Sequence, residues 1–158
     1  MPTDVLPGLN ECNCLAIRQA GRQITQFYDQ YLAPVGLRAT QFSVLARLRQ
    51  TGPMTIAALA SELLMDRTTM GRSIVPLERE GLIRVVPGRS DRRSKELQLT
   101  EAGVKRVKAA YKGWKQAQAR FASVFGEARA AGLRELLRAV SAADLGGTAS
   151  GQRIALTP

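Results

Sequence analysis

Apolar residues recur every three or four positions along most of this chain, which is the spacing of amphipathic helices. The first such stretch covers Cys14–Leu32 and ends at APVGL, where Pro and Gly break a helix. A second stretch follows Thr40, whose hydroxyl side chain is typical of an N-cap, and ends at the TGP sequence of residues 51–53. The pattern therefore predicts two amphipathic helices in the first third of the chain.

Two shorter helices are predicted next, each preceded by a side chain that can cap it. Thr55 precedes IAALASELL, residues 56–64, and Asp66 precedes RTTMGRSIVPLERE, residues 67–80. Both residue types accept hydrogen bonds from the free backbone amides of a first helical turn. Gly81 follows the second helix, as glycine often does at a helix C-terminus. A short helix, a tight turn and a second helix together form a helix-turn-helix.

After the helix-turn-helix, the period changes from that of helices to that of strands. LIRVVP (82–87) and KELQLT (95–100) are short, rich in branched residues and separated by GRSDRRS, which indicates a β-hairpin. Thr100 is then the expected N-cap of a long helix over 101–125, and a last helix is predicted over 127–143. The predicted fold class is mainly α with a small β-hairpin.

A helix-turn-helix followed by a hairpin is a winged helix-turn-helix, here with longer helices at both ends. Each flanking helix is amphipathic and too long for the small central domain to cover, so we expect a second copy of the chain to cover the apolar faces. Five segments are predicted: a flexible N-terminus (1–11), an N-terminal dimerisation helix (12–36), a winged helix-turn-helix domain (37–100), C-terminal dimerisation helices (101–145) and a disordered tail (146–158).

Composition narrows the classes of function. Of the 158 residues, 23 are Lys or Arg and 13 are Asp or Glu, so the net charge is +10, which favours a polyanionic partner such as nucleic acid. The chain has no histidine, which removes the usual general base and a common metal ligand. Its two cysteines are too few for a four-thiolate zinc site. We therefore expect no metal, no cofactor and no enzymatic activity.

The sequence also lacks the signals of a membrane or secreted protein. No apolar run approaches the roughly 18 residues that a membrane span needs. The first residues, MPTDVLPGLNE, lack the basic start and apolar stretch of a secretory signal. We expect a cytoplasmic protein without a membrane partner.

The second helix of the predicted helix-turn-helix carries side chains that suit a DNA groove. Met70, Ile74 and Leu77 recur at i, i+4 and i+7 and form the face toward the core. The residues between them face away, where Arg can bond guanine and Thr offers a hydroxyl or a methyl group. A glycine there costs roughly 1 kcal/mol of helix stability but permits a close approach. The predicted recognition residues are Arg67, Thr68, Thr69, Gly71 and Arg72. The alternative is that they decorate a solvated helix face.

The tip of the predicted hairpin concentrates positive charge. Such a tip can lie along or in the minor groove, which attracts Arg where it is narrow. Asp91 would accept hydrogen bonds from a neighbouring Arg side chain and hold it in one rotamer. Charges on hairpin edges also discourage aggregation, but that alternative does not explain why nearly all the charge is positive. The predicted wing residues are Arg89, Asp91, Arg92, Arg93 and Lys95.

The stretch LASELLMDRTTMGRSIVPLEREGLIRVVPGRSDRRSKELQLTEAG resembles the MarR family of bacterial dimeric transcription regulators. LEREGLI, the wing sequence DRR and LQLTEAG match the most recognisable stretch of that family, in which D-x-R precedes an apolar–x–L–T–x–x–G pattern. The resemblance implies a homodimer built from the terminal helices, with two winged helix domains on a pseudo-palindromic operator of double-stranded DNA. It also implies that Asp91 and Arg93 are the wing pair, and that the effectors are small aromatic or anionic molecules.

Two cysteines lie at the start of the first predicted helix, where free backbone amides favour a thiolate. Arg18 lies one helical turn after Cys14 and could stabilise that charge. In the organic-hydroperoxide regulators of the MarR family, a reactive cysteine lies near the start of this helix. By this resemblance Cys14 takes its place and Tyr28 that of an accompanying tyrosine, whereas Arg18 replaces the second tyrosine. The predicted redox residues are Cys14, Cys12, Tyr28 and Arg18. The alternative is that both cysteines are small apolar residues packed at a dimer interface.

Together these observations predict a sequence-specific, dimeric DNA-binding transcriptional regulator of the MarR type. We expect a repressor that is released from DNA by a small-molecule ligand or by oxidation of Cys14. The competing hypothesis is a winged-helix module that binds another protein and no DNA, with its charge serving solubility.

Overall fold

The computed structural model describes residues 8–145, which form two compact units. The first unit ends at Ala117 and the second begins at Gln118, so the boundary falls inside a long helix. The predicted disordered tail lies outside the described residues, as do the first seven residues of the predicted flexible N-terminus. The last three residues of that N-terminal segment, Leu9–Glu11, form one 3-10 turn, η1.

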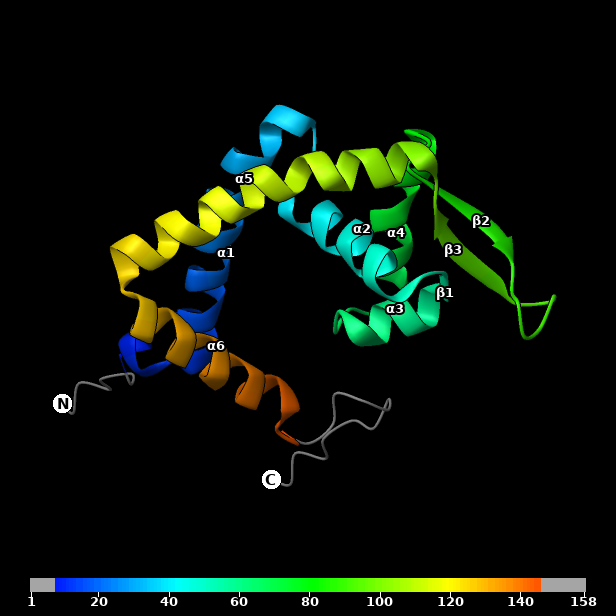
Figure 1. Cartoon of the computed structure of the whole chain (residues 1–158). Helices are drawn as coiled ribbons and strands as arrows, with labels where there is room; N and C mark the ends of the chain where they lie inside the picture. Colours follow the sequence, from blue (N-terminus) through cyan, green and yellow to red (C-terminus); the bar gives the residue numbers. More distant parts are fainter. Residues whose placement is uncertain (1–7, 146–158) are drawn as a thin grey trace, which may run out of the picture. The chain divides into compact units, whose positions relative to one another are not determined.

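The elements follow one another in the predicted order (Figure 1). After η1 they are α1 (Asn13–Leu32), η2 (Ala33–Val35), α2 (Ala39–Thr51), β1 (Met54–Thr55), α3 (Ile56–Glu62), α4 (Arg67–Arg79), β2 (Ile83–Pro87), β3 (Lys95–Leu99), α5 (Glu101–Phe125) and α6 (Glu127–Ala142). The fold class is confirmed as mainly α with a small β-hairpin. The third helix ends at Glu62, two residues earlier than predicted.

The small sheet has one strand more than the sequence predicts. β2 and β3 form the expected antiparallel hairpin, with Val85 opposite Leu97. The two residues of β1 pair with the other edge of β3, where Met54 lies opposite Leu97, so the strand order is β1-β3-β2. β1 is missed because two residues are too short for any strand periodicity. It attaches the start of the helix-turn-helix to the wing.

Local caps explain where several helices begin. Thr55 Oγ1 accepts a hydrogen bond from the amide of Ala58 at 3.1 Å, and Thr100 Oγ1 accepts one from the amide of Gly103 at 3.0 Å. Both caps were predicted from residue type.

The predicted cap of the second helix is wrong. Thr40 lies inside α2, which begins at Ala39. The Ala39 amide donates to Asp29 Oδ1 of α1 at 2.6 Å, so the capping carboxylate comes from the preceding helix. Sequence spacing could not show this cap, because its donor and acceptor are ten residues apart.

The core of the first unit lies among α2, α3, α4, the sheet and the first half of α5. Its fully buried side chains include Leu45, Leu77 and Val107, from three different helices. Phe42 of α2 packs with the rings of Tyr111 and Trp114 of α5, whose centroids lie 5.6 and 6.3 Å away. The first half of α5 thus belongs to the same core as the helix-turn-helix.

The second unit contains the end of α5 and all of α6. Phe121 and Phe125 stack with their centroids 5.2 Å apart, and the guanidinium of Arg129 lies 4.4 Å from the centre of the Phe125 ring. Further along α6, Leu136, Leu137 and Val140 are exposed. These three side chains give α6 an exposed apolar face.

Candidate nucleic-acid interface

The start of α4 is held by its cap, as the sequence predicts. Asp66 Oδ1 accepts from the Thr69 amide at 2.8 Å, and Asp66 Oδ2 accepts from the Thr69 hydroxyl at 2.5 Å. These bonds favour the carboxylate form and hold the pKa of Asp66 below its ordinary value. The side chain of Thr69 is therefore part of the cap, which is a different role from the predicted one.

One face of α4 is apolar and packs against the core. Met70, Ile74 and Leu77 are buried, as predicted from their spacing. The tight turn before α4 is closed by a 2.8 Å hydrogen bond from the Met65 amide to the Ala60 carbonyl. Leu64 adopts a positive φ of 51° in this turn. These contacts fix which face of α4 is turned outward.

The outward face of α4 carries the other predicted recognition residues. Arg67, Thr68 and Arg72 are exposed, and none of their side chains forms a hydrogen bond or ion pair within residues 8–145. Gly71 is half-buried, and an added Cβ there would meet nothing within 4 Å. The open space at Gly71 agrees with a surface that another molecule can approach closely.

The wing tip is a rigid turn. Gly88 and Ser94 close it through a 2.9 Å bond from the Gly88 amide to the Ser94 carbonyl. Ser94 Oγ in turn donates to the Asp91 carbonyl at 2.7 Å. A Cβ on Gly88 would collide with both the Ser94 hydroxyl and the Asp91 carbonyl, so this position needs glycine. The turn holds the charged residues of the tip at defined positions.

Asp91 acts on the backbone of this turn. Its Oδ1 accepts from the Arg93 amide at 2.9 Å, whereas a bond to an Arg side chain is predicted from the sequence. The difference follows from geometry, since a short Asp side chain readily bonds the amide two residues further on. Asp91 and Arg93 are in contact, but the guanidinium of Arg93 is not held by the carboxylate.

The positive charges of the wing have no acidic partner within residues 8–145. The two ion pairs of this part of the chain are Arg47–Glu62 and Arg106–Glu80, and neither involves the wing. The exposed basic residues of the tip are Arg89, Arg92, Arg93 and Lys95. Because α4 packs against β2, whose hairpin projects from the helices in Figure 1, the outward face of α4 and the wing belong to the same compact unit.

Two exposed residues of α4 were missed by the sequence analysis. Val75 and Arg79 continue the outward face toward the C-terminal end of the helix. A valine at helical spacing is usually assigned to a core. Its position around the helix relative to Met70 and Leu77 argues against that assignment, because it puts Val75 on the other side of the helix.

On α1, Tyr28 lies far from the other predicted redox residues. Cys12 is the N-cap, and its Sγ accepts from the Leu15 amide at 3.4 Å, while Cys14 is exposed and both thiols are free. Tyr28 lies 14 residues after Cys14, which is about 21 Å along a helix at 1.5 Å per residue. Arg18 is exposed on the same helix. Any joint role of Cys14 and Tyr28 therefore needs a second copy of the chain.

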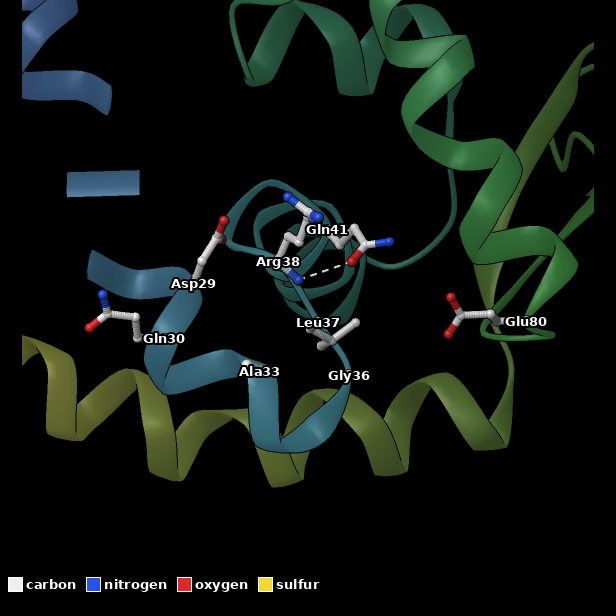
Figure 2. A pocket seen from close by; sticks show the side chains of 8 residues that line it. All are labelled: Asp29, Gln30, Ala33, Gly36, Leu37, Arg38, Gln41 and Glu80. Carbon is white, nitrogen blue, oxygen red and sulfur yellow. Dashed lines mark hydrogen bonds between the residues drawn. The ribbon is translucent and has the colours of Figure 1, made fainter. Parts of the chain in front are cut away.

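A surface pocket of about 580 Å³ lies beside the end of α4 (Figure 2). Asp29 and Gln30 line it from α1, and Arg38 and Gln41 from the start of α2. Glu80, the C-cap residue that follows α4, stands on the opposite side of the space. Figure 2 also shows the 2.9 Å bond from the Arg38 amide to Gln41 Oε1, which shapes the α2 side of the pocket.

Residues 8–145 contain neither a metal-binding cluster nor a membrane-spanning helix. No group of three or more His, Cys, Asp or Glu side chains lies close enough to hold a metal ion. In the same part of the chain, no helix combines the length and apolar content that crossing a bilayer requires.

Comparison with known sequences gives a family match over the helix-turn-helix and most of the wing. The profile of the MarR family matches residues 37–95. The transcriptional regulator YwoH of Bacillus subtilis is 37% identical over 90 residues, which are 57% of this chain and 65% of that protein. This chain thus spans a little less than two thirds of the length of that relative.

Solved structures match nearly the whole described chain. The M. tuberculosis transcriptional regulator MosR is 32% identical with a TM-score of 0.73, over 86% of this chain and 100% of that chain. Its complex with DNA gives 35% identity and a TM-score of 0.71, over 84% and 98%. BpsR of Bordetella bronchiseptica, whose DNA binding is regulated by 6-hydroxynicotinic acid, is 26% identical with a TM-score of 0.77, over 88% and 99%. YwoH and MosR are both transcriptional regulators, and BpsR binds DNA.

Proposed function

This chain belongs to the MarR family of transcriptional regulators, and on that premise we propose that it binds operator DNA as a homodimer and represses transcription. The observation that supports the proposal most directly is that α4 and the wing share two properties. Both have a backbone fixed by internal hydrogen bonds, and both leave their basic side chains without acidic partners within residues 8–145. The DNA complex of MosR, a relative at 35% identity, supports the same use of this fold.

In the proposed complex, α4 enters the major groove and the wing follows the neighbouring minor groove. The N-terminal residues of a recognition helix contact base edges in winged and other helix-turn-helix proteins. Arg72 and Thr68 have the side-chain types for such contacts. Arg89, Arg92 and Arg93 supply phosphate or minor-groove contacts, which add affinity with less dependence on sequence.

We propose that the dimer uses the exposed apolar residues of the flanking helices. On α1, Ile17 is 44% exposed, and on α6, Leu136 is 69% exposed. Large apolar side chains clustered on one helix face mark a surface that another protein covers. Two-fold symmetry would then place two copies of α4 in successive major grooves, about 10 base pairs apart or a multiple of that spacing.

Gel-shift titration against fragments of the protein's own promoter region tests this function. We expect binding that weakens steeply with salt, with log K falling by about 0.9 for each neutralised phosphate. A band that persists unchanged from low to high salt would contradict the proposal. The alternative function, a winged-helix module that binds another protein, predicts no retarded band with any fragment.

For release from DNA, we propose a small aromatic or anionic effector in the pocket of Figure 2. Asp29 bonds the Ala39 amide and Glu80 pairs with Arg106, which leaves the Arg38 guanidinium as the cation that can bind a ligand carboxylate. A ligand seated there would lie against Glu80 at the end of α4. The regulation of BpsR by 6-hydroxynicotinic acid supports an effector of this class.

Titration calorimetry with 6-hydroxynicotinate and with benzoate tests the effector proposal. Arg38→Gln should weaken ligand binding at least tenfold and make DNA release less sensitive to the ligand. Arg22→Gln, at another exposed arginine on α1, is the matched control and should change neither. Equal binding by both variants would show that the pocket is not the effector site.

We propose oxidation of Cys14 as the second route of release, because its thiol is exposed. A hydroperoxide would oxidise the thiolate to a sulfenic acid and be reduced to its alcohol. Treating the protein with cumene hydroperoxide should release wild-type protein from DNA, while Cys14→Ser should stay bound. If the Cys14→Ser protein is released like the wild type, the oxidation hypothesis is wrong.

A further inference from the structure

We propose that Val75 of α4 contacts the C5-methyl group of a thymine in the major groove and so sets part of the operator sequence. The inference rests on the proposed function, since it assigns a base contact to the same helix. Val75 is 50% exposed on a helix whose other large apolar side chains, Met70, Ile74 and Leu77, are at most 5% exposed. Val75 is therefore the large apolar side chain that α4 presents on its outward face.

Val75 shares one narrow stripe with the polar recognition residues. Thr68, Gly71, Arg72 and Val75 stand at i, i+3, i+4 and i+7, which on a helix of 3.6 residues per turn spans an arc of about 100°. The same spacing describes the base-contacting residues of the homeodomain recognition helix. The stripe lies opposite the buried face of α4, so a helix laid in a groove along it would present Val75 to the bases.

The neighbouring hydroxyl side chains are already engaged. Thr69 bonds Asp66 in the cap, and Ser73 Oγ donates to the Thr69 carbonyl at 2.9 Å. These residues flank the stripe and are held away from a base contact by those bonds. The available surface of the stripe thus consists of Thr68, the bare backbone at Gly71, Arg72 and Val75.

The chemistry of this surface favours thymine as the partner of Val75. In the major groove, the C5-methyl of thymine is the apolar group that distinguishes it, and an apolar side chain is its natural contact. Valine is stiff at χ1, so placing its two methyl groups against the base costs little side-chain entropy. Gly71, one turn earlier, has no side chain to keep the helix away from the base pairs.

The test begins with operators selected from a random DNA library by the full-length protein. Each thymine of the selected site is then replaced by deoxyuridine, which removes only the C5-methyl group. We expect one position per half-site at which the replacement weakens wild-type binding about three- to tenfold, the effect of losing one or two buried methyl-sized contacts. At that position the Val75→Ala protein should show no further loss on replacement.

Two more variants separate this contact from a general effect on folding or affinity. Val75→Thr keeps the shape and one methyl group, so it should retain part of the penalty for deoxyuridine. Val85→Ala changes another exposed valine, on β2, and should keep the full wild-type penalty at the same position.

The experiment distinguishes a failure of the proposed function from a failure of the Val75 contact alone. If selection yields no preferred sequence and no salt-dependent binding, the proposed function itself is wrong. If a preferred sequence is found but Val75→Ala and wild type respond equally to deoxyuridine at every position, Val75 contacts no thymine methyl and the inference is overturned.

Discussion

The Nη1 atom of Arg106 lies 3.5 Å from the carboxylate of Glu80, so an arginine of α5 pairs with the C-cap residue of α4. The same atom donates a 3.1 Å hydrogen bond to the Val35 carbonyl in η2. One guanidinium thereby connects the recognition helix, the long helix and the corner between α1 and α2. The end of α4 is fixed by this connection, and its start by the Asp66 cap.

We expect replacement of Glu80 and replacement of Arg106 to lower the stability of the protein by different amounts. Both side chains of the ion pair are partly exposed, so Glu80→Gln should lower the free energy of unfolding by at most about 1 kcal/mol. Arg106→Met also removes the bond to Val35 and should cost about 1–2 kcal/mol. Urea denaturation measures both, and equal losses would mean that the Val35 bond contributes nothing.

Replacing Gly71 by alanine should separate stability from DNA binding. The added methyl meets no atom within 4 Å, so the better helix former should raise the free energy of unfolding by up to about 1 kcal/mol. The same methyl occupies the space left for DNA, and we expect a clear loss of operator affinity. Gly21→Ala on α1, also open around its Cβ, is the control for the gain in stability. A Gly71→Ala protein with wild-type affinity would contradict a close approach at this position.

The wing and the recognition helix should affect specificity in different ways. Arg93→Ala should weaken binding to all sequences and lower the salt slope by about 1, as expected for a phosphate contact. Arg72→Ala should instead relax discrimination at one base position, with a cost of about 1–3 kcal/mol for the preferred base. Binding to a panel of single-base operator variants measures this, and identical profiles for the two variants would count against the division.

The Asp66 cap should give the protein a measurable acid dependence. Its hydrogen bonds with Thr69 lower the pKa of Asp66 in the folded state, so the stabilisation is complete above the unfolded-state pKa of about 4 and is lost as the pH falls through the lower folded value. Asp66→Asn keeps a capping side chain but cannot titrate. Below about pH 4, the free energy of unfolding of Asp66→Asn should therefore fall less with acid than that of the wild type. Parallel curves for the two proteins would show that the cap does not titrate on unfolding.

Much of the fold was predictable because its causes are local. The caps at Thr55, Asp66 and Thr100 depend on a side chain and an amide three residues apart, and the buried stripe of α4 depends on helical spacing. For the same reason the sequence placed Arg72 on the outward face of its helix and the wing arginines at the tip of the hairpin. Val75 escaped notice because the residue type alone suggests a core.

The sequence by itself determined the helix-turn-helix, the hairpin and the charge of the surface they share, since each follows from residue type and short-range spacing. Only the tertiary structure decided the roles of Asp29, Glu80 and Thr69, and the pairing of β1 with β3. The partners of Asp29 and Glu80 and of the strands come from other elements of the chain, and a side chain's periodicity carries no information about what another element places beside it. Thr69 could have either faced a groove or closed a cap, and the position of the Asp66 carboxylate settled that choice.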